Sequence, residues 1–504
     1  MLNVYPLGGI KKLASQTVWY GFSNIGSRML NYLLTPLLTS LFAAGDFSKI
    51  STLFAMAAFM NIIFTFGMET TYFRFLNEEK EQKVFNASFT TIIFSTFIFS
   101  ILCFVLVDPI ASVIKLPDDP EYVQWVILIV IFDTLSTIPF AKLRHTGRPH
   151  KYAFVKLSNV ILQIALIYFI LVVCKNAEST SILYGLYNPD IGVGYVILAN
   201  VFASALTFLM LSTEILEFKW EIDLSLLKKM LLYTMPLLIV GFGGMINEMI
   251  DRFMLLNYYP GTIQEKHIMN GIYSANYKLA VVIVLFIQAF RLGAEPFFFK
   301  SAVNADAPLV YARVMKYFVI TCCICFLGVV LFLDLWKYFM GNTHKEYWSG
   351  LIIVPLLMVA KIFLGIYYNL SVWYKLTNRN LMGAWITIGG AIITVVLNYL
   401  LIPHWGYTAC AVTTIICYGS MMISSYYFGQ KYFPVPYDIK RIIGYILFAV
   451  VIYVIYYLIA NDMTNIPVKL LIGLFLCIIY AFFIIQTDKA EFRRLPFLSK
   501  WIVK

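Results

Sequence analysis

"GGMINEMIDRFMLL", residues 243–256, sets Glu248, Asp251 and Arg252 into an otherwise apolar stretch. Residues four apart share one face of an α-helix, so Glu248 faces the same way as Arg252, and Asn247 the same way as Asp251. An ionisable side chain inside a membrane helix costs at least about 2.5–3.5 kcal/mol, so it normally meets water or a partner there. The stretch therefore predicts a membrane-spanning helix with a polar face turned toward a cavity.

The composition of the whole chain also indicates that lipid surrounds it. Of 504 residues, 61% are hydrophobic and only 13% are charged, and the mean hydropathy is +0.79. A soluble domain is usually about 45–50% apolar and about 25% charged. No soluble core absorbs this much apolar sequence, so we expect an all-α polytopic membrane protein embedded in a lipid bilayer.

Apolar runs of about 20 residues, the length that a helix needs to cross the hydrocarbon core, alternate with polar breaks. We expect fourteen transmembrane helices, over residues 13–41, 47–74, 84–107, 121–142, 152–174, 191–213, 226–257, 270–299, 310–336, 347–373, 380–402, 406–430, 441–460 and 466–486. The segments between them are short. This weighs against a membrane glycosyltransferase, ligase or polymerase, which works through large external loops.

The basic residues predict an orientation. Most lie in the tails and loops that face the N-terminal side, for example in "KLRHTGRPHK" (142–151), while the opposite side receives Lys49, Lys115, Lys175, Lys266, Lys337, Lys345 and Lys469. Cytoplasmic loops are enriched in Lys and Arg, so both termini should be cytoplasmic. Topology thus explains the net charge of +11 without nucleic acid as a partner.

An internal repeat predicts the arrangement of the helices. "FGMETTYFRF" (66–75) and "RLGAEPFFFKS" (291–301) share the pattern Gly-x-Glu-x-x-aromatic-Phe-cation, six predicted helices apart. An even number of helices between the copies gives both the same orientation, which implies two parallel six-helix bundles with the substrate path between them. We expect lobes over 1–213 and 214–430, followed at 431–504 by two additional helices and a basic cytoplasmic tail.

Further ionisable residues fall inside the predicted spans. The candidates for binding an anionic substrate are the cations Arg28, Arg252, Lys278, Arg291 and Lys361; the candidates for coupling to an ion gradient are Asp133, Glu248 and Asp251. The structural alternative is that these charges pair with one another, or that Lys278 snorkels to the interface. Guanidinium suits a phosphate because it is planar, bidentate and permanently charged, and a lipid-linked pyrophosphate sugar is one such substrate.

Other residue types point to no cofactor. The eight cysteines lie in or beside apolar runs, and "CCIC" at 322–325 is surrounded by Ile, Val, Leu and Phe, so packing explains them. The five histidines fall in predicted loops and have no second ligand at helical spacing. We expect neither a metal site nor a catalytic site.

Four stretches carry a resemblance to a known family: "LNYLLIPHWGYTACAVTTIICYG" (397–419), "WYKLTNRN" (373–380), "GFSNIGSRMLNYLLTPLLTSLF" (21–42) and "NEMIDRFML" (247–255). With them the whole chain resembles the polysaccharide biosynthesis proteins, the O-antigen-type flippases of the multidrug/oligosaccharidyl-lipid/polysaccharide exporter superfamily. The family's Gly-x-x-Gly-Ala-Ala turn is degenerate here, because Thr408 and Cys410 replace small residues.

The resemblance implies a pair of bundles (MATE-like) that exposes a cationic cavity alternately to each side of the bacterial inner membrane. It implies transfer of a polyprenyl-pyrophosphate-linked oligosaccharide, a repeat unit of O-antigen, capsule or exopolysaccharide, from the cytoplasmic to the periplasmic leaflet. Glycan polymerase or ligase machinery would be the protein partners. By position, Arg28, Asp251 and Arg252 correspond to the family's cavity charges.

Two alternatives stay open. The first is a cation-coupled exporter of small amphiphiles, as in the multidrug branch of the superfamily, for which Asp133, Glu248 and Asp251 would suit the ion site. The second is a membrane enzyme, which the short loops disfavour.

Overall fold

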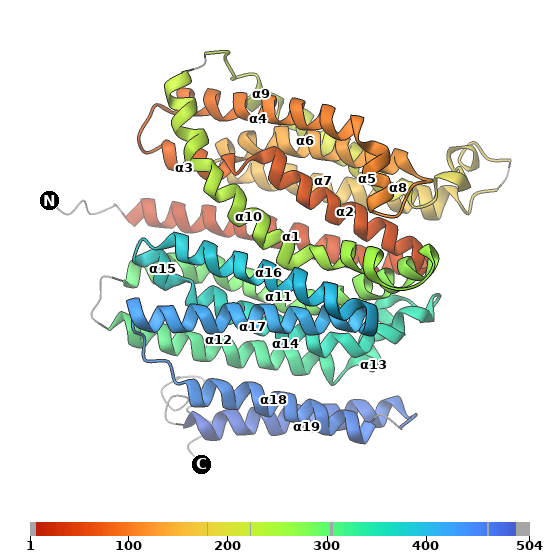
Figure 1. Ribbon diagram of the computed structural model, residues 1–504, viewed down its shortest axis with the longest axis vertical. Helices are drawn as coiled ribbons and strands as arrows, with labels where there is room; N and C mark the ends of the chain where they lie inside the picture. The colour runs from red at the N-terminus through yellow and green to blue at the C-terminus, as the bar shows by residue number, and fades with distance from the viewer. Residues whose placement is uncertain (1–6, 179, 222, 303–305, 461–462, 490–504) are drawn as a thin grey trace. The chain divides into compact units, whose positions relative to one another are not determined.

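The computed structural model describes residues 7–178, 180–221, 223–302, 306–460 and 463–489. Side chains are described from residue 19 onward, except those of Phe22, Glu295, Pro296 and Lys300. All regular secondary structure in these ranges is helical (Figure 1). The expected basic tail after residue 489, and the Glu295 and Lys300 side chains of the repeat, lie outside the described residues.

Twelve segments in the described part are long and apolar enough to cross a membrane. They are α2–α3 (Ala44–Thr65, Met68–Phe75), α4 (Glu81–Val105), α6 (Pro120–His145), α7 (Pro149–Tyr168) with the π-helical turn Phe169–Cys174, α10 (Leu224–Tyr258), α11 (Ile263–Ser301), α12 (Ala307–Val330), α14–α15 (Val354–Leu370, Val372–Leu376) with the 3-10 turn Lys345–Ile353, α16 (Asn380–Trp405), α17 (Tyr407–Tyr432), α18 (Ile439–Ala460) and α19 (Ile466–Thr487).

Two expected spans differ from the others. Helix α1 (Leu7–Leu41) covers the first, and α8 (Gly194–Met210) covers the sixth. The segments Tyr184–Ile191 and Gly194–Met210 are together long and apolar enough for one span, but they are bent by 115° relative to each other. The multi-pass helical architecture is confirmed, while the count of fourteen stays a prediction. The short helices α5 (Val107–Val113), α9 (Ser212–Ile215) and α13 (Leu333–Trp336) lie between spans.

Local sequence explains where the helices start and break. Asp223 caps α10, because its side chain accepts hydrogen bonds from the backbone N–H groups of Ser225 and Leu226. The expected helix 47–74 is broken at Phe66 and Gly67, which both adopt positive φ, +54° and +66°. The repeat partner of Gly67, Gly293, lies inside the continuous helix α11. The two copies of the motif therefore differ in backbone conformation.

The chain divides into two compact units. Unit 1 comprises residues 1–275, 343–347 and 387–413; unit 2 comprises 276–342, 348–386 and 414–504. In unit 1, α6 packs on α2, α4 and α8, and α7 packs on α1 and α8. In unit 2, α12 packs on α14 and α18, and α18 on α19. The expected lobe boundaries at 213 and 430 stay a prediction.

The first turns of α11 belong to unit 1 because they touch α2 closely. A Cβ atom on Gly271 would lie 1.7 Å from the carbonyl oxygen of Ala44, so only glycine fits this crossing. His267 shares a hydrogen bond of 3.0 Å with Ser48, and the amide of Asn270 donates to the same hydroxyl at 2.9 Å. These contacts fix the start of α11 on α2.

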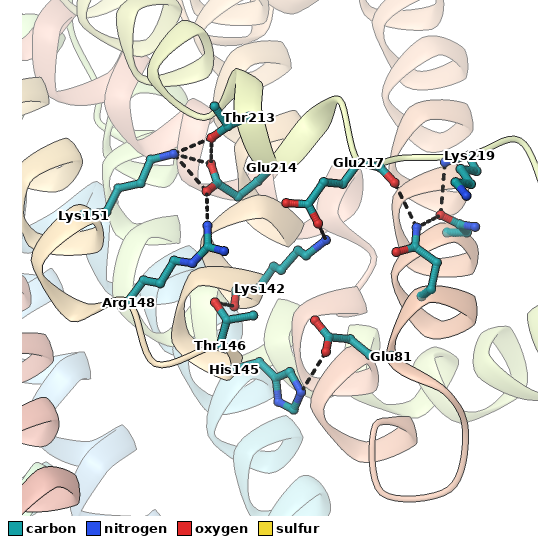
Figure 2. A network of polar contacts seen from close by, with 12 residues as sticks. Glu81, Lys142, His145, Thr146, Arg148, Lys151, Thr213, Glu214, Glu217 and Lys219 are labelled. Carbon is teal, nitrogen blue, oxygen red and sulfur yellow. Dashed lines mark hydrogen bonds and ion pairs between the residues drawn. The ribbon is translucent and has the colours of Figure 1, made fainter.

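Charged side chains tie helix ends together in unit 1 (Figure 2). The buried carboxylate of Glu214, on α9, pairs with Lys151 of α7 at 2.6 Å and with Arg148 at 3.4 Å. Lys142, near the end of α6, pairs with Glu217 at 2.5 Å. We call these five residues the helix-end network. It fastens α6 and α7 to the segment that leads into α10.

Unit 2 has a corresponding cluster around Asp488, just after α19. The carboxylate accepts hydrogen bonds from Lys316 of α12 at 2.9 Å and from Arg441 and Tyr445 of α18 at 2.7 and 2.6 Å. Burial alone raises the pKa of Asp488, but the hydrogen bonds from Tyr445 and Lys316 and the nearby positive charges outweigh burial and lower it. The cluster therefore holds an ionised carboxylate that joins three helices.

Candidate substrate-binding site

The charged pair in the opening stretch lies deep inside unit 1. Asp251 and Arg252 of α10 are 5% and 4% exposed. One carboxylate oxygen accepts the Arg252 backbone N–H at 2.9 Å and the guanidinium Nη1 at 3.0 Å. The same Nη1 donates to the backbone carbonyl of Glu248 at 3.1 Å. The ion pair described for Arg252 thus joins it to its chain neighbour, and Glu248 contributes its carbonyl.

A tyrosine from a second helix completes this pair. The hydroxyl of Tyr273, on α11, donates to the other carboxylate oxygen of Asp251, and the guanidinium carbon lies 5.9 Å from the centre of the Tyr273 ring. Two hydrogen bonds and one ion pair hold the carboxylate, which orients the arginine on the helix. Tyr273 could not be identified from the sequence, because nothing distinguishes it from the other tyrosines.

Polar side chains of α10 and α16 extend this site within unit 1. The amide of Asn247 donates to the Thr387 carbonyl at 3.1 Å and accepts from the Thr394 hydroxyl at 3.3 Å. One turn further along α16, Asn398 is 1% exposed. Neither polar atom of its side chain has a hydrogen-bond partner within the described residues. A mid-span asparagine is a signal that sequence inspection can detect, and it was missed.

In unit 2 the most deeply buried cation is Lys361 of α14, which is 0% exposed. Its ammonium donates to the hydroxyl of Tyr277 at 2.5 Å. It lies 4.8 Å from the centre of the Tyr277 ring and 5.1 Å from that of Tyr418. Tyrosine rings attract a cation through their negative faces, most strongly where water is excluded.

The remaining predicted cations have varied surroundings. Arg291 of α11 is half-buried, and its guanidinium stacks 4.3 Å above the ring of Tyr368. Lys278, also on α11, is half-buried, and Arg28 of α1 is exposed. The structure therefore groups Asp251 and Arg252 in unit 1 and places Lys278, Arg291 and Lys361 in unit 2.

Asp133 lies apart from the charged pair, on α6 in unit 1. It lines a cavity of about 370 Å³ together with Asn61 of α2 and Asn200 of α8. Ser204 of α8 is its hydrogen-bonding neighbour, and Lys156 of α7 is within electrostatic reach.

A purely apolar groove lies in unit 2. It has a volume of about 460 Å³ and runs between α14, α17 and α18, where Phe363, Ile366, Ile423, Ile443 and Leu447 contribute to its lining. Such a surface suits a hydrocarbon chain. In the part of the chain that the structure describes, no three His, Cys, Asp or Glu side chains come together to hold a metal ion.

Comparison with known proteins relates this architecture to transporters. The structure of the lipid II flippase MurJ in an inward closed conformation is similar, with a TM-score of 0.68 and 14% identity over 93% of this chain and 99% of that one. The structure of an inward-facing multidrug resistance MATE transporter of the MOP superfamily has a TM-score of 0.59 and 14% identity, over 82% of this chain and 94% of that one. The structure of the Vibrio cholerae MATE transporter VcmN in its bent form has a TM-score of 0.53 and 12% identity, over 84% of this chain and 98% of that one.

These structural likenesses concern the fold alone, and no curated protein matches the sequence. The family comparison goes further, because the family described as polysaccharide biosynthesis protein matches residues 13–301, more than half of the chain. The protein is a multi-pass membrane protein and belongs to the polysaccharide biosynthesis protein family.

Proposed function

We propose that this protein is a flippase for a lipid-linked oligosaccharide. It moves a polyprenyl-pyrophosphate-linked repeat unit of O-antigen, capsule or exopolysaccharide from the cytoplasmic to the periplasmic leaflet of a bacterial inner membrane, with both termini cytoplasmic. Alternating access of two lobes carries the headgroup, and no covalent bond changes. Glycan polymerase or ligase machinery takes over the product. The observation that carries the proposal is the family match together with buried cations inside the spans.

The cations are assigned to the pyrophosphate. Arg252 is held rigidly by Asp251, so its outer N–H groups are oriented before a ligand arrives, which lowers the cost of binding. Arg28 and Arg291 offer the same bidentate geometry, and Lys278 and Lys361 add point charges. Lys361 is fully buried in this conformation, so it meets the substrate in another state of the transport cycle.

The apolar groove of unit 2 is assigned to the polyprenyl chain. A chain that stays in an apolar groove keeps its contact with hydrocarbon while the polar headgroup moves, because burying it costs no hydrogen bond. Asp251 and Glu248 are assigned to coupling with an ion gradient, since protonation of Asp251 would weaken its hold on Arg252.

A cation-coupled exporter of small amphiphiles is the second candidate. The similarity of the fold to the multidrug resistance MATE structures favours it, as do the carboxylates in the spans. It differs from the first proposal in the substrate, a cationic amphiphile instead of an anionic lipid.

The test is reconstitution in liposomes that carry a polyprenyl-pyrophosphate oligosaccharide, with the glycan in the outer leaflet measured over time by an impermeant lectin. Lys361→Met and Arg28→Ala should each slow transfer by about 100-fold, as expected for loss of a charge-assisted contact to phosphate. Lys175→Met, which removes an exposed cation, is the control and should leave the rate unchanged.

Two results would reject the flippase proposal. One is absence of transfer by the wild-type protein with any lipid-linked glycan. The other is full transfer by Lys361→Met and Arg28→Ala combined. Uptake of a cationic dye, driven by an ion gradient and abolished in Asp251→Asn, would establish the second candidate.

A further inference from the structure

The cavity beside Asp133 has a construction of its own. Four residues of α2, at positions 54, 57, 58 and 61, line it at intervals that place them on one helix face. Phe54 and Asn61 stand at the ends of this stripe, and Ala57 and Ala58 lie between them. The two methyl side chains leave room that larger residues would fill, so the hollow follows from the sequence of α2.

Three polar side chains face this hollow from three helices. Asn61 comes from α2, Asp133 from α6 and Asn200 from α8. All three are half-buried, so they are reachable from the cavity. Within the described part of the chain, no hydrogen bond occupies the amide group of Asn61 or Asn200. A carboxylate with two unoccupied amides supplies four N–H donors and several acceptor oxygens at one place.

The chemistry of this set matches a sugar. A pyranose ring presents neighbouring hydroxyls, each of which both donates and accepts, together with patches of apolar C–H. A carboxylate accepts from two hydroxyls, and an amide donates to one and accepts from another. The apolar wall, formed by Phe54, Met245 and the aliphatic residues of α6, suits the C–H patches. The volume of about 370 Å³ falls in the range of small-molecule sites.

A metal cation fits the same residues less well. Lys156 lies within electrostatic reach of Asp133, so a positive charge already acts on the carboxylate that a cation would need. A hard cation also prefers several oxygen ligands, more often with more than one carboxylate. Hydroxyl groups, by contrast, are compatible with a lysine nearby.

We propose that the cavity lined by Asn61, Asp133 and Asn200 is a saccharide subsite that binds a sugar ring of the transported headgroup. This inference rests on the proposed flippase function and assigns the glycan to unit 1, apart from the cations that serve the pyrophosphate. It gives Asp133 a binding role in place of ion coupling. The subsite contributes to selection among glycans, because a headgroup without matching hydroxyls leaves the amides of Asn61 and Asn200 unsatisfied.

The experiment compares two lipids with the same polyprenyl pyrophosphate, one bearing an oligosaccharide and one bearing no sugar. Transfer of the first, and competition by the second, are measured in proteoliposomes. Asp133→Leu and Asn61→Leu should each lower apparent affinity for the oligosaccharide lipid by at least about tenfold, the loss of one or two hydrogen bonds. Competition by the sugar-free lipid should stay within about twofold of wild type.

Two further variants keep the test decisive if a leucine disturbs folding. Asp133→Asn retains hydrogen bonding to hydroxyls but removes the charge, so transfer should persist within about threefold. Ala58→Met fills the hollow without touching a polar group and should weaken the oligosaccharide lipid selectively. Asn176→Leu, in an exposed segment, is the control.

The outcomes separate this inference from the function on which it rests. Failure of the wild-type protein to transfer any oligosaccharide lipid rejects the flippase function itself. Wild-type transfer that Asp133→Leu, Asn61→Leu and Ala58→Met leave unchanged rejects the subsite alone. A fall in transfer by Asp133→Asn well beyond threefold, with the remaining transfer no longer dependent on an ion gradient, overturns the subsite in favour of a cation site.

Discussion

The ion pairs of the helix-end network and the ion pair inside the α10 span do different things in unit 1. In the helix-end network, Lys151 and Glu214 come from α7 and α9, so their contact joins separate helices. In the membrane span, Asp251 and Arg252 are neighbours on α10, so their contact joins no two helices. It fixes the direction of one side chain, and Tyr273 is the added contact from α11.

The difference teaches how charge is used in this protein. A pair between helices stabilises the fold, and its energy depends on how far each partner can still reach water. A pair within one helix is a poor way to stabilise a fold, because desolvation of both ions offsets their attraction. Under the proposed function, the pair in the span instead orients the arginine toward the anionic headgroup.

The largest expected effect is on transfer, when the Asp251–Arg252 pair in the span is removed. Asp251→Asn with Arg252→Met removes both charges of this pair together. We expect transfer of lipid-linked glycan to fall by about 100-fold while the melting temperature changes little. Leaflet assays and thermal melting in detergent measure the two quantities.

The matched control removes a pair from the helix-end network. Lys142→Met with Glu217→Gln should leave transfer within about threefold of wild type and lower stability by about 1 kcal/mol, because Glu217 is half-exposed and screened. Equal losses of transfer in both double variants would show that the two regions do not differ in role.

The next effect compares the loss of stability when either Lys151 or Glu214 of the helix-end network is replaced. Lys151→Met leaves the carboxylate of Glu214, 1% exposed, with a weakened set of partners, so we expect a loss of about 3 kcal/mol. Glu214→Gln leaves Lys151 and Arg148, which reach water, and should cost only about 1 kcal/mol. Denaturation followed by intrinsic fluorescence measures both variants, and an equal cost would contradict the asymmetry.

The last expected effect is the pH dependence of stability at the Asp488 cluster. Because the folded-state pKa of Asp488 is lowered, its contribution to stability is fully present above the unfolded value of about 3.9 and is lost as the pH falls through the folded value. Asp488→Asn should therefore cost about 1.5–3 kcal/mol from pH 5 to 8. That difference from wild type should shrink below about pH 4; a constant difference down to pH 3 would contradict the ionised cluster.

Much of the fold could be predicted from hydropathy alone. Each expected span overlaps helical segments, and twelve segments in the described part are long and apolar enough to cross a membrane, because apolar length sets where a chain can cross a bilayer. The break at Phe66 and Gly67 was not predicted from hydropathy, since apolar length carries no information on positive φ angles or on the close approach of Thr234 of α10 to Gly67. Nor could the bend before α8, which lies between two short helical segments.

The buried charges of the candidate site were predictable from the sequence, but the side chains that contact them were not. Position in a span identified Arg252, Asp251 and Lys361, because burying a charge is costly wherever the helix packs. The tyrosines that contact them come from elsewhere in the chain, and the sequence contains 34 tyrosines. Only tertiary structure shows which aromatic ring meets a cation.

The cluster around Asp488 has a consequence for synthesis in the cell. Lys316 enters the membrane with α12, but its carboxylate partner follows α19, well over a hundred residues later in the chain. Until α18 and α19 have been synthesised, Lys316 of α12 lacks this counter-charge. A chain that ends before Asp488 therefore leaves this buried ammonium without the carboxylate that it meets in the full-length protein.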